Sequence, residues 1–296
     1  MKIAIAGSSG LIGTQLVASL RADGHEVLRL VRRPATAPME VTWDPSAGSV
    51  DVGKLAGVDV LVNLAGAGVG DHRWSAKYKQ IILDSRVNST ALCADIATKV
   101  LPHVFISASA IGWYGDTAEH EVDESTGAGT GFLADVVRAW EAAAQPARDA
   151  GIRVVHPRTG LVISSKGGAW GKLLPIFKLG LGGKMGSGKQ YWSYISMADE
   201  IAALKFLIAN ESISGPVNLT APQPATNTQI TKSMGRILRR PTLFPVPAFI
   251  LKTVLGEFST EILGSTRVLP TVLTNSGYEF IHPSLDLALA TLTEGA

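Results

Sequence analysis

The sequence has a single cysteine, no long uncharged apolar run and little net charge. Cys93 alone can form neither an internal disulfide nor a multi-cysteine metal site, and its apolar helical surroundings suit a small buried residue. No uncharged apolar run reaches about 18 residues, the length that indicates a membrane-spanning helix. The six histidines show no metal-ligand spacing, so no metal is expected.

Composition narrows the class of protein further. A net charge of +2 argues against nucleic-acid binding, which needs a concentrated basic face. With 46% hydrophobic residues, the 296-residue chain can bury a core in one large domain or two interlocked ones. Because the chain starts on an apolar strand and not on a signal peptide, we expect a cytoplasmic protein without a membrane partner. Both a monomer and a homodimer are compatible with the sequence.

The first fifteen residues combine the features of a dinucleotide site. An apolar run over residues 3–6 predicts a buried parallel strand, which breaks into Gly7, Gly10 and Gly13, and an amphipathic helix follows. In this context Gly7 permits a tight turn, Gly10 lets the backbone approach a pyrophosphate, and Gly13 lets the helix pack on the strand. The free N–H groups at the helix start face the anion. The predicted cofactor contacts here are Gly7, Ser8, Ser9, Gly10, Leu11, Ile12 and Gly13.

The second predicted strand indicates which dinucleotide binds. Residues 26–31 form an apolar run that ends in Arg32 and Arg33. NAD sites usually carry an acid about 20 residues after the glycines, where it accepts from the ribose hydroxyls. Two arginines stand there instead, and guanidinium groups suit a 2′-phosphate, so the sequence favours NADP(H). The alternative is that both arginines are ordinary surface charges at a strand end.

Strand-like and helix-like segments alternate along the chain. Apolar runs at 58–66, 103–108 and 152–156 are separated by helical segments at about 75–100 and 133–150. Such alternation predicts an α/β fold with a doubly wound parallel sheet. Ligands of these sheets bind beyond the carboxyl ends of the strands. The segments expected around that crevice are Gly7–Gly13, Arg32, Asn63–Gly66, Ser107–Tyr114 and Pro157–Gly160.

These motifs together resemble the extended short-chain dehydrogenase/reductase superfamily. The residues that carry the resemblance are Gly7-x-x-Gly10-x-x-Gly13, Asn63-Leu-Ala-Gly66, Ser107-Ala-Ser-Ala-Ile-Gly-Trp-Tyr-Gly115 and Arg158-Thr-Gly160. The chain is further similar to one atypical branch, the NAD-dependent epimerase-like "epimerase family protein" group with a C-terminal domain of unknown function. The motifs of that branch are Trp140-Glu-Ala-Ala-Ala144, the glycines of 167–188, Pro245-Val-Pro247, Leu255-Gly-Glu257, Ser265-Thr-Arg-Val-Leu-Pro270 and Gly277-Tyr-Glu-Phe280.

The resemblance implies both an organisation and further cofactor contacts. Residues 1–165 are expected to form a Rossmann domain that binds NADP(H), and residues 166–296 mostly a smaller substrate lobe, with about 190–220 returning to the main sheet. Arg86 matches an arginine that the family places near the cofactor, and Arg158 ends a strand at the same crevice. For Arg86 the alternative is a solvated helix face. The contacts expected after the glycine turn are Arg32, Arg33, Asn63, Leu64, Ala65, Gly66, Arg86, Ser107 and Arg158.

The usual catalytic pair of the superfamily is absent. Short-chain reductases use a tyrosine four residues before a lysine, and none of the five tyrosines here has a lysine at that spacing. We therefore expect another proton donor, with Tyr114 as the main candidate, Asp116 as a weaker one, and Ser107 or Ser109 positioning a carbonyl group. The alternatives are a tyrosine that only packs against the pocket wall and serines that bond nearby backbone.

Three functions remain open at this point. The first is an NADPH-dependent oxidoreductase acting by hydride transfer on an unknown small carbonyl or alcohol. The second is a nucleotide-sugar epimerase, in which Arg236, Arg239 and Arg240 could hold a diphosphate, although a solvated helix end is the more common role of such residues. The third is a non-catalytic NADP-binding sensor or regulator, which would need no catalytic pair.

Two segments of the second half also invite interpretation. Residues 183–189 resemble a phosphate-binding loop, but Gln190 replaces the required Ser or Thr, so a mobile glycine-rich lid over the substrate is the better hypothesis. Tyr194 and Ser196 stand where the family typically has Trp and His, which puts any role of that histidine in doubt here. Trp113, Trp170 and Trp192 are expected either to line a pocket or to pack in the core.

Overall fold

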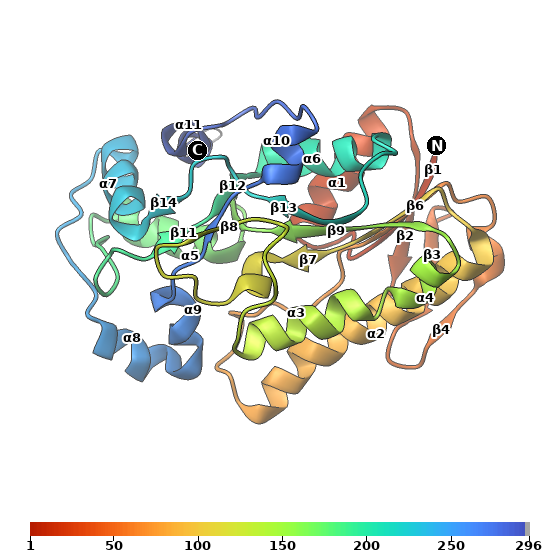
Figure 1. Cartoon of the computed structure of the whole chain (residues 1–296), viewed down its shortest axis with the longest axis horizontal. Helices are drawn as coiled ribbons and strands as arrows, with labels where there is room; N and C mark the ends of the chain where they lie inside the picture. Colours follow the sequence, from red (N-terminus) through yellow and green to blue (C-terminus); the bar gives the residue numbers. More distant parts are fainter. Residues whose placement is uncertain (294–296) are drawn as a thin grey trace.

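A mostly parallel sheet forms the centre of the computed structural model, which describes residues 1–293 (Figure 1). Its strands lie side by side in the order β13-β9-β6-β5-β1-β2-β3-β4, and β7 also pairs with β9. All described pairs within this sheet are parallel except β3 with β4. The strands are β1 (Lys2–Ala6), β2 (Glu26–Val31), β3 (Glu40–Asp44), β4 (Ser49–Val50), β5 (Val60–Asn63), β6 (Val104–Ser107), β7 (Ser109–Ala110), β9 (Arg153–Thr159) and β13 (Gly215–Leu219).

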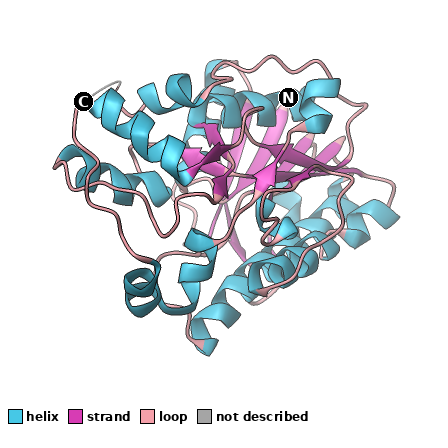
Figure 2. Ribbon diagram, turned by 60° about the vertical axis from the view of Figure 1, so that its left-hand side comes forward, coloured by secondary structure: helices cyan, strands magenta, loops and turns pink. Residues whose placement is uncertain are grey.

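Helices cover both faces of this sheet, as Figures 1 and 2 show. Successive strand residues face opposite sides, so Ile3 and Ile5 pack with Leu16 on one face while Ala4 and Ala6 pack on the other. Because both faces of these strands are buried, their sequences are continuous apolar runs. The helices are α1 (Leu11–Ala22), α6 (Met197–Ala209) and α10 (Thr271–Asn275) on the first face, and α2 (Ala76–Val100), α3 (Phe132–Ala142) and α4 (Gln145–Asp149) on the second.

The second half of the chain adds a smaller lobe at one end of the sheet (Figure 1). Its core contains Trp170, Trp192 and Tyr194, so these aromatic side chains pack in the interior. The lobe contains β10 (Leu161–Ile163), β11 (Tyr191–Trp192), β12 (Tyr194–Ser196), β14 (Ala225–Thr226), α5 (Gly168–Lys178), α7 (Asn227–Leu238), α8 (Ala248–Leu255), α9 (Ser259–Leu263) and α11 (Leu285–Ala290). The remaining short elements are β8 (Glu121–Val122), β15 (Arg267–Val268) and the 3-10 turns η1 (Val52–Leu55), η2 (Ile111–Tyr114) and η3 (Gly256–Phe258).

The two halves of the chain are interleaved. The segment expected to return to the main sheet contains β13, which pairs with β9 along Gly215–Leu219. The division of the chain at residue 165 stays a prediction. Over residues 1–293, no helix combines the length and the apolar character needed to cross a membrane.

The chain reverses its direction of travel across the sheet at β1. The strand that follows β1 in sequence lies on one side of it, and β5 lies on the other. At such a switch point the loops after the two strands diverge and leave a crevice at their carboxyl ends. The glycine turn after β1 and the Asn63–Gly66 turn after β5 therefore face the same space.

Candidate functional site

The glycine turn after β1 is fixed by close backbone contacts. Gly7 has φ +74°, and a Cβ there would lie 2.5 Å from the backbone of Leu64. A Cβ at Gly13 would lie 2.2 Å from the carbonyl oxygen of Gly7, so only glycine lets α1 approach the turn this closely. The first turn of α1 has no acidic residue and no side-chain cap, so its N–H groups are left to an anion.

The end of β2 carries one free arginine and one paired arginine. Arg33 donates two hydrogen bonds to the carboxylate of Glu40, at 2.6 and 2.8 Å. This contact holds the pKa of Glu40 at about 2, well below its usual range. Arg32 is exposed, and no ion pair engages it within residues 1–293. The expected contact of Arg33 with a 2′-phosphate stays a prediction. Because β3, which pairs with β2, brings a carboxylate to Arg33, Arg32 is the better candidate for that contact.

Arg29 is a residue of this region that sequence reasoning missed. It lies within β2, and its Nε donates to Ser8 Oγ in the glycine turn at 3.2 Å. Its Nη1 lies 3.6 Å from Glu40 Oε1, and the side chain is 30% exposed. Successive residues of a strand point to opposite faces of the sheet, and Arg29 points to the face that carries the glycine turn. A basic residue at such a position of β2 is the sequence signal that could have identified Arg29.

The turn after β5 is held from beneath by a buried asparagine. Asn63 donates through Nδ2 to Thr90 at 3.0 Å and to Ser89 at 3.3 Å, and its Oδ1 accepts from the N–H of Ala65 at 3.0 Å. Every polar atom of this amide is engaged, so its side chain shapes the turn. The expected contact of Asn63 with the cofactor stays a prediction, while the backbone of Leu64 and Ala65 lies beside Gly7.

Arg86 carries a charge that no described carboxylate matches. It reaches from α2 toward Gly66, donates to the carbonyl oxygen of Ile82 at 3.0 Å and lies 5.0 Å from the ring of Trp140. Burial lowers its pKa to about 10. A largely buried guanidinium with no carboxylate among residues 1–293 beside it suits an incoming anion.

Arg158 and Tyr114 belong to a buried network. Arg158 is 2% exposed and forms two hydrogen bonds with Glu141, at 2.9 and 3.0 Å, while Ser109 donates to the same carboxylate at 2.6 Å. Arg158 also donates to the hydroxyl of Tyr114, which in turn donates to Asn218 at 2.8 Å. Its guanidinium lies 4.0 Å from the ring of Trp113.

This network engages three of the expected site residues. The anion that matches Arg158 is a carboxylate of the protein itself, so no cofactor contact is needed to explain its burial. Tyr114 is 3% exposed, burial raises its pKa and its hydroxyl is held in the network, so its role as a proton donor stays a prediction. Ser109 is likewise engaged with Glu141. Their pairing partners are distant in sequence, which is why the strand-end pattern alone suggested another role.

Ser107 lies at the carboxyl end of β6, directly beside Asn63. Its carbonyl oxygen is 3.2 Å from Nδ1 of His156, whose Nε2 is 2.7 Å from a guanidinium nitrogen of Arg148. Burial lowers the pKa of His156 to about 4, so the ring is neutral, with Nδ1 donating and Nε2 accepting. The Ser107 hydroxyl is buried and has no partner in the described part of the chain, so it remains a candidate contact.

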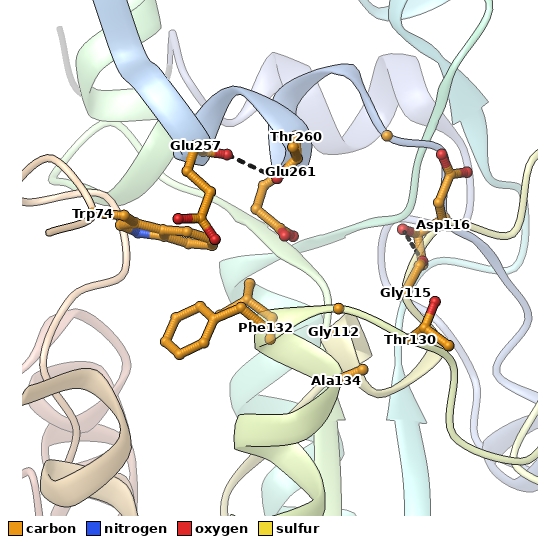
Figure 3. Close-up of a pocket in the computed structure, with 14 residues that line it drawn as sticks. Trp74, Gly112, Gly115, Asp116, Thr130, Phe132, Ala134, Glu257, Thr260 and Glu261 are labelled. Atoms are coloured by element: carbon orange, nitrogen blue, oxygen red, sulfur yellow. Dashed lines mark hydrogen bonds between the residues drawn. The ribbon is translucent and has the colours of Figure 1, made fainter. Parts of the chain in front are cut away.

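A cavity of about 290 Å³ opens between the start of α3, the loop after η2 and α9 (Figure 3). Trp74, Phe132 and Leu133 give it an apolar wall, and the carboxyl groups of Asp116 and Glu261 give it a polar one. One helical turn beyond Leu133, α3 buries Val137 in a cluster with Leu64 of the turn after β5. Helix α3 therefore lies between the cavity and the turn after β5.

The two carboxyl groups of the cavity differ in their surroundings. Asp116 accepts through Oδ1 from the N–H groups of Ala118 at 2.9 Å and Ser265 at 3.2 Å, which fixes its orientation. Enclosure by the cavity walls raises the pKa of Glu261 to about 7, and the charge of Asp116 acts in the same direction. The Glu261 side chain stays exposed to the cavity, where a bound molecule could exchange a proton with it. Sequence reasoning named Asp116 and missed Glu261.

The glycine-rich segment 183–189 packs against the chain that enters α8. Lys184 accepts through its carbonyl oxygen from Val246 N at 2.8 Å, and Gly188 accepts from Thr228 N at 2.9 Å. Gly186 and Ser187 line a second hollow of about 410 Å³, which shares Asp116 with the first. Its mobility as a lid stays a prediction. Ser196 caps α6 by accepting from Asp199 N.

Comparison with known proteins supports one family. Residues 3–219 match the NAD dependent epimerase/dehydratase family, and residues 246–292 match a domain of unknown function, DUF1731. An epimerase family protein of Mycobacterium leprae is 43% identical over 98% of this chain and 95% of its own length.

Two solved structures resemble the whole chain. The human epimerase family protein SDR39U1 (isoform 2), solved with NADPH, is 32% identical with a TM-score of 0.93 and full coverage of both chains. A nucleoside-diphosphate sugar epimerase of Corynebacterium glutamicum is 34% identical with a TM-score of 0.81, over 98% of this chain and 58% of the other.

Proposed function

The chain belongs to the NAD-dependent epimerase/dehydratase family, and from this premise we propose that it is an NADP(H)-dependent oxidoreductase acting on a small carbonyl or alcohol. The observation that carries the proposal is the pairing of a glycine turn at a free helix N-terminus with the unpaired Arg32 at the end of β2. The related human protein was solved with NADPH, which supports the same cofactor here.

The residues present fit such a cofactor. The turn from Gly7 to Gly13 would hold the pyrophosphate, because no side chain caps the N–H groups in the first turn of α1. Arg86, a buried cation with no carboxylate beside it in the described residues, would add positive charge near the turn after β5. Arg32, which no ion pair engages within residues 1–293, would face a 2′-phosphate. When bound, the nicotinamide would supply or accept a hydride; the protein supplies orientation and protons.

Replacement of Arg32 by Ala tests the choice of cofactor. We expect NADPH affinity to fall about 10- to 100-fold, because a charge-assisted contact contributes about 1.5–3 kcal/mol, and NADH affinity to change little. Fluorescence titration measures both. The matched control is Arg33→Ala, whose partner is Glu40, and we expect it to leave NADPH selectivity in place. Equal losses of both cofactors on replacing Arg32 would contradict the 2′-phosphate role.

A proton donor must accompany hydride transfer, and we propose Glu261 for this role. Its carboxyl group lines the cavity at the start of α3, and with a pKa of about 7 it can hold or release a proton near neutral pH. Asp116, beside it, would favour its protonated form. Tyr114 is not proposed, because its hydroxyl is held by Arg158 and Asn218.

The pH dependence follows from the raised pKa of Glu261. Carbonyl reduction needs the protonated acid, so its rate should be highest below pH 7 and fall as pH rises through about 7. Glu261→Gln should lower kcat by about 100-fold or more and abolish that limb of the profile. The matched control is Glu257→Gln on the same cavity wall, where the carboxylate pairs with Lys79. An unchanged profile in Glu261→Gln would remove Glu261 from the mechanism.

Turnover separates this proposal from its alternatives. NADPH oxidation across a panel of small aldehydes and ketones should be measured with the purified protein. Turnover supports the oxidoreductase, whereas tight binding without turnover favours a sensor. A nucleotide-sugar epimerase would instead interconvert sugar nucleotides with no net oxidation of NADPH. Because the related Corynebacterium glutamicum protein is a nucleoside-diphosphate sugar epimerase, those compounds are the first to include.

A further inference from the structure

Two segments of the smaller lobe expose an unusual set of large apolar side chains. They are residues 176–184, at the end of α5, and residues 239–254, which lead into and form α8; together we call them the α5–α8 surface. Leu179 and Leu243 are 74% and 75% exposed, and Phe249 is 68% exposed. The exposed large apolar residues of this surface are Ile176, Leu179, Leu181, Leu243, Phe244, Phe249, Ile250 and Val254. A folded domain normally scatters such side chains singly.

The two segments form one continuous surface because they run side by side. Arg240 Nε donates to the carbonyl oxygen of Lys178 at 2.9 Å. The N–H of Val246 donates to Lys184 at 2.8 Å. Figure 1 shows the chain between α7 and α8 running along the outer margin of the molecule. The exposed apolar residues therefore lie on two adjacent segments of the lobe.

Helix α8 presents its apolar residues outward. Leu251 is buried, whereas Phe249, Ile250 and Val254 are 68%, 40% and 61% exposed. The charged Lys252 is exposed beside them. A helix on the surface of a soluble domain normally turns one apolar stripe to the core and covers the rest with polar residues. In α8 apolar residues occupy the outer side as well, so this helix has an apolar face without a partner in residues 1–293.

The charge of the surface is of one sign. Residues 166–198 and 212–256 each contain five Lys or Arg and no Asp or Glu, although the whole chain carries only +2. Five of these cations lie exposed in the α5–α8 surface, and none forms an ion pair with the described residues. They are Lys178, Lys184, Arg239, Arg240 and Lys252. The small net charge of the chain conceals this concentration.

Apolar side chains interleaved with unpaired cations suit an anionic lipid surface. Side chains such as Phe249 and Leu243 can enter the boundary between headgroups and acyl chains, while Lys and Arg meet the phosphates. A second copy of this chain is a poorer occupant, because a two-fold contact would bring the five cations of each copy against the same five of the other.

We propose that the α5–α8 surface docks this protein on anionic lipid bilayers, with α8 lying in the plane of the headgroups. The docking is peripheral and independent of the proposed reaction. It departs from the sequence-based expectation of no membrane partner, which rested on the lack of a signal peptide and of a long uncharged apolar run. Ala248 and Lys252 of α8 also line the second hollow, so docking would bring that hollow to the lipid surface.

The test is co-sedimentation of the full chain with vesicles. We expect binding to phosphatidylcholine vesicles that contain phosphatidylglycerol, little binding to phosphatidylcholine alone, and release at high salt. Phe249→Asn combined with Leu243→Asn should abolish binding, and each of Arg239→Gln and Lys252→Gln should weaken it about fivefold. The matched control is Leu101→Asn, which removes a 66% exposed leucine from the end of α2.

Three outcomes would overturn the proposal. The first is no binding to vesicles of either composition. The second is binding that neither salt nor the α5–α8 substitutions reduce. The third is concentration-dependent self-association in size-exclusion chromatography that Phe249→Asn abolishes while vesicle binding is absent, which would assign the surface to a second copy. NADPH titration of the same variants keeps the test separate from the proposed function, because we expect their cofactor affinity to be unchanged.

Discussion

Replacement of Gly13 by Ala is expected to lower NADPH affinity about 10- to 100-fold. The added Cβ would lie 2.2 Å from the carbonyl oxygen of Gly7 and 2.9 Å from Cα of Ser8. Relieving that overlap must move α1 away from the turn, and overpacking of this kind costs about 1–3 kcal/mol. The N–H groups that would bind the pyrophosphate move with the helix. Fluorescence titration with NADPH measures the loss.

The matched control for this change is Gly127→Ala. A Cβ at Gly127 meets nothing within 4 Å, and its φ is not in the left-handed region. We expect unchanged NADPH affinity and an unchanged circular dichroism spectrum. If Gly13→Ala binds NADPH as tightly as the control does, the close packing of α1 on the turn is not what forms the anion site.

The buried pair of Arg158 and Glu141 is expected to have a large effect on the free energy of unfolding. Glu141→Ala should lower the free energy of unfolding by about 3–5 kcal/mol, because it leaves the guanidinium of Arg158 buried without a counter-charge. The loss should extend to the partners of the network, since Tyr114 accepts from the same arginine. Urea denaturation measures the change. Arg158→Met together with Glu141→Met should recover much of it, because the pair is then removed as a unit.

An exposed ion pair on the same helix provides the control. Arg138 and Asp135 contact each other on the surface of α3, where both side chains are about half exposed. Arg138→Ala should change the free energy of unfolding by about 0.5 kcal/mol or less. If Glu141→Ala also changes the free energy of unfolding by only about 0.5 kcal/mol, the Arg158–Glu141 pair does not stabilise the fold as a buried ion pair.

Local sequence patterns predicted the sheet and the glycine turn well. Gly7 and Gly13 act on neighbours within a few residues, and the alternation of strand and helix follows from hydrophobic periodicity along the chain. The partners of buried charges are set instead by strand pairing and by contacts between distant segments. Glu40 reaches Arg33 because β3 pairs with β2, and Glu141 reaches Arg158 from a helix. Neither pairing is visible in the sequence pattern.

The substrate side was the least predictable part of the chain. Glu261 enters the cavity from α9, almost 150 residues after Asp116, and no motif joins the two positions. Its raised pKa depends on the walls that surround it, which only the assembled structure supplies. Tyr114 illustrates the reverse case: its place at a strand end suggested chemistry, but folding brings Asn218 to its hydroxyl.

The central claim is that this chain holds NADP(H) in the crevice between β1 and β5. Titration of the purified protein with NADPH and with NADH, followed by fluorescence, tests it most directly. We predict saturable binding with at least about tenfold tighter affinity for NADPH, because an ion pair with a phosphate contributes about 1.5 kcal/mol or more. Equal affinity for both cofactors would contradict the role of Arg32, and binding of neither would contradict the assignment of the crevice.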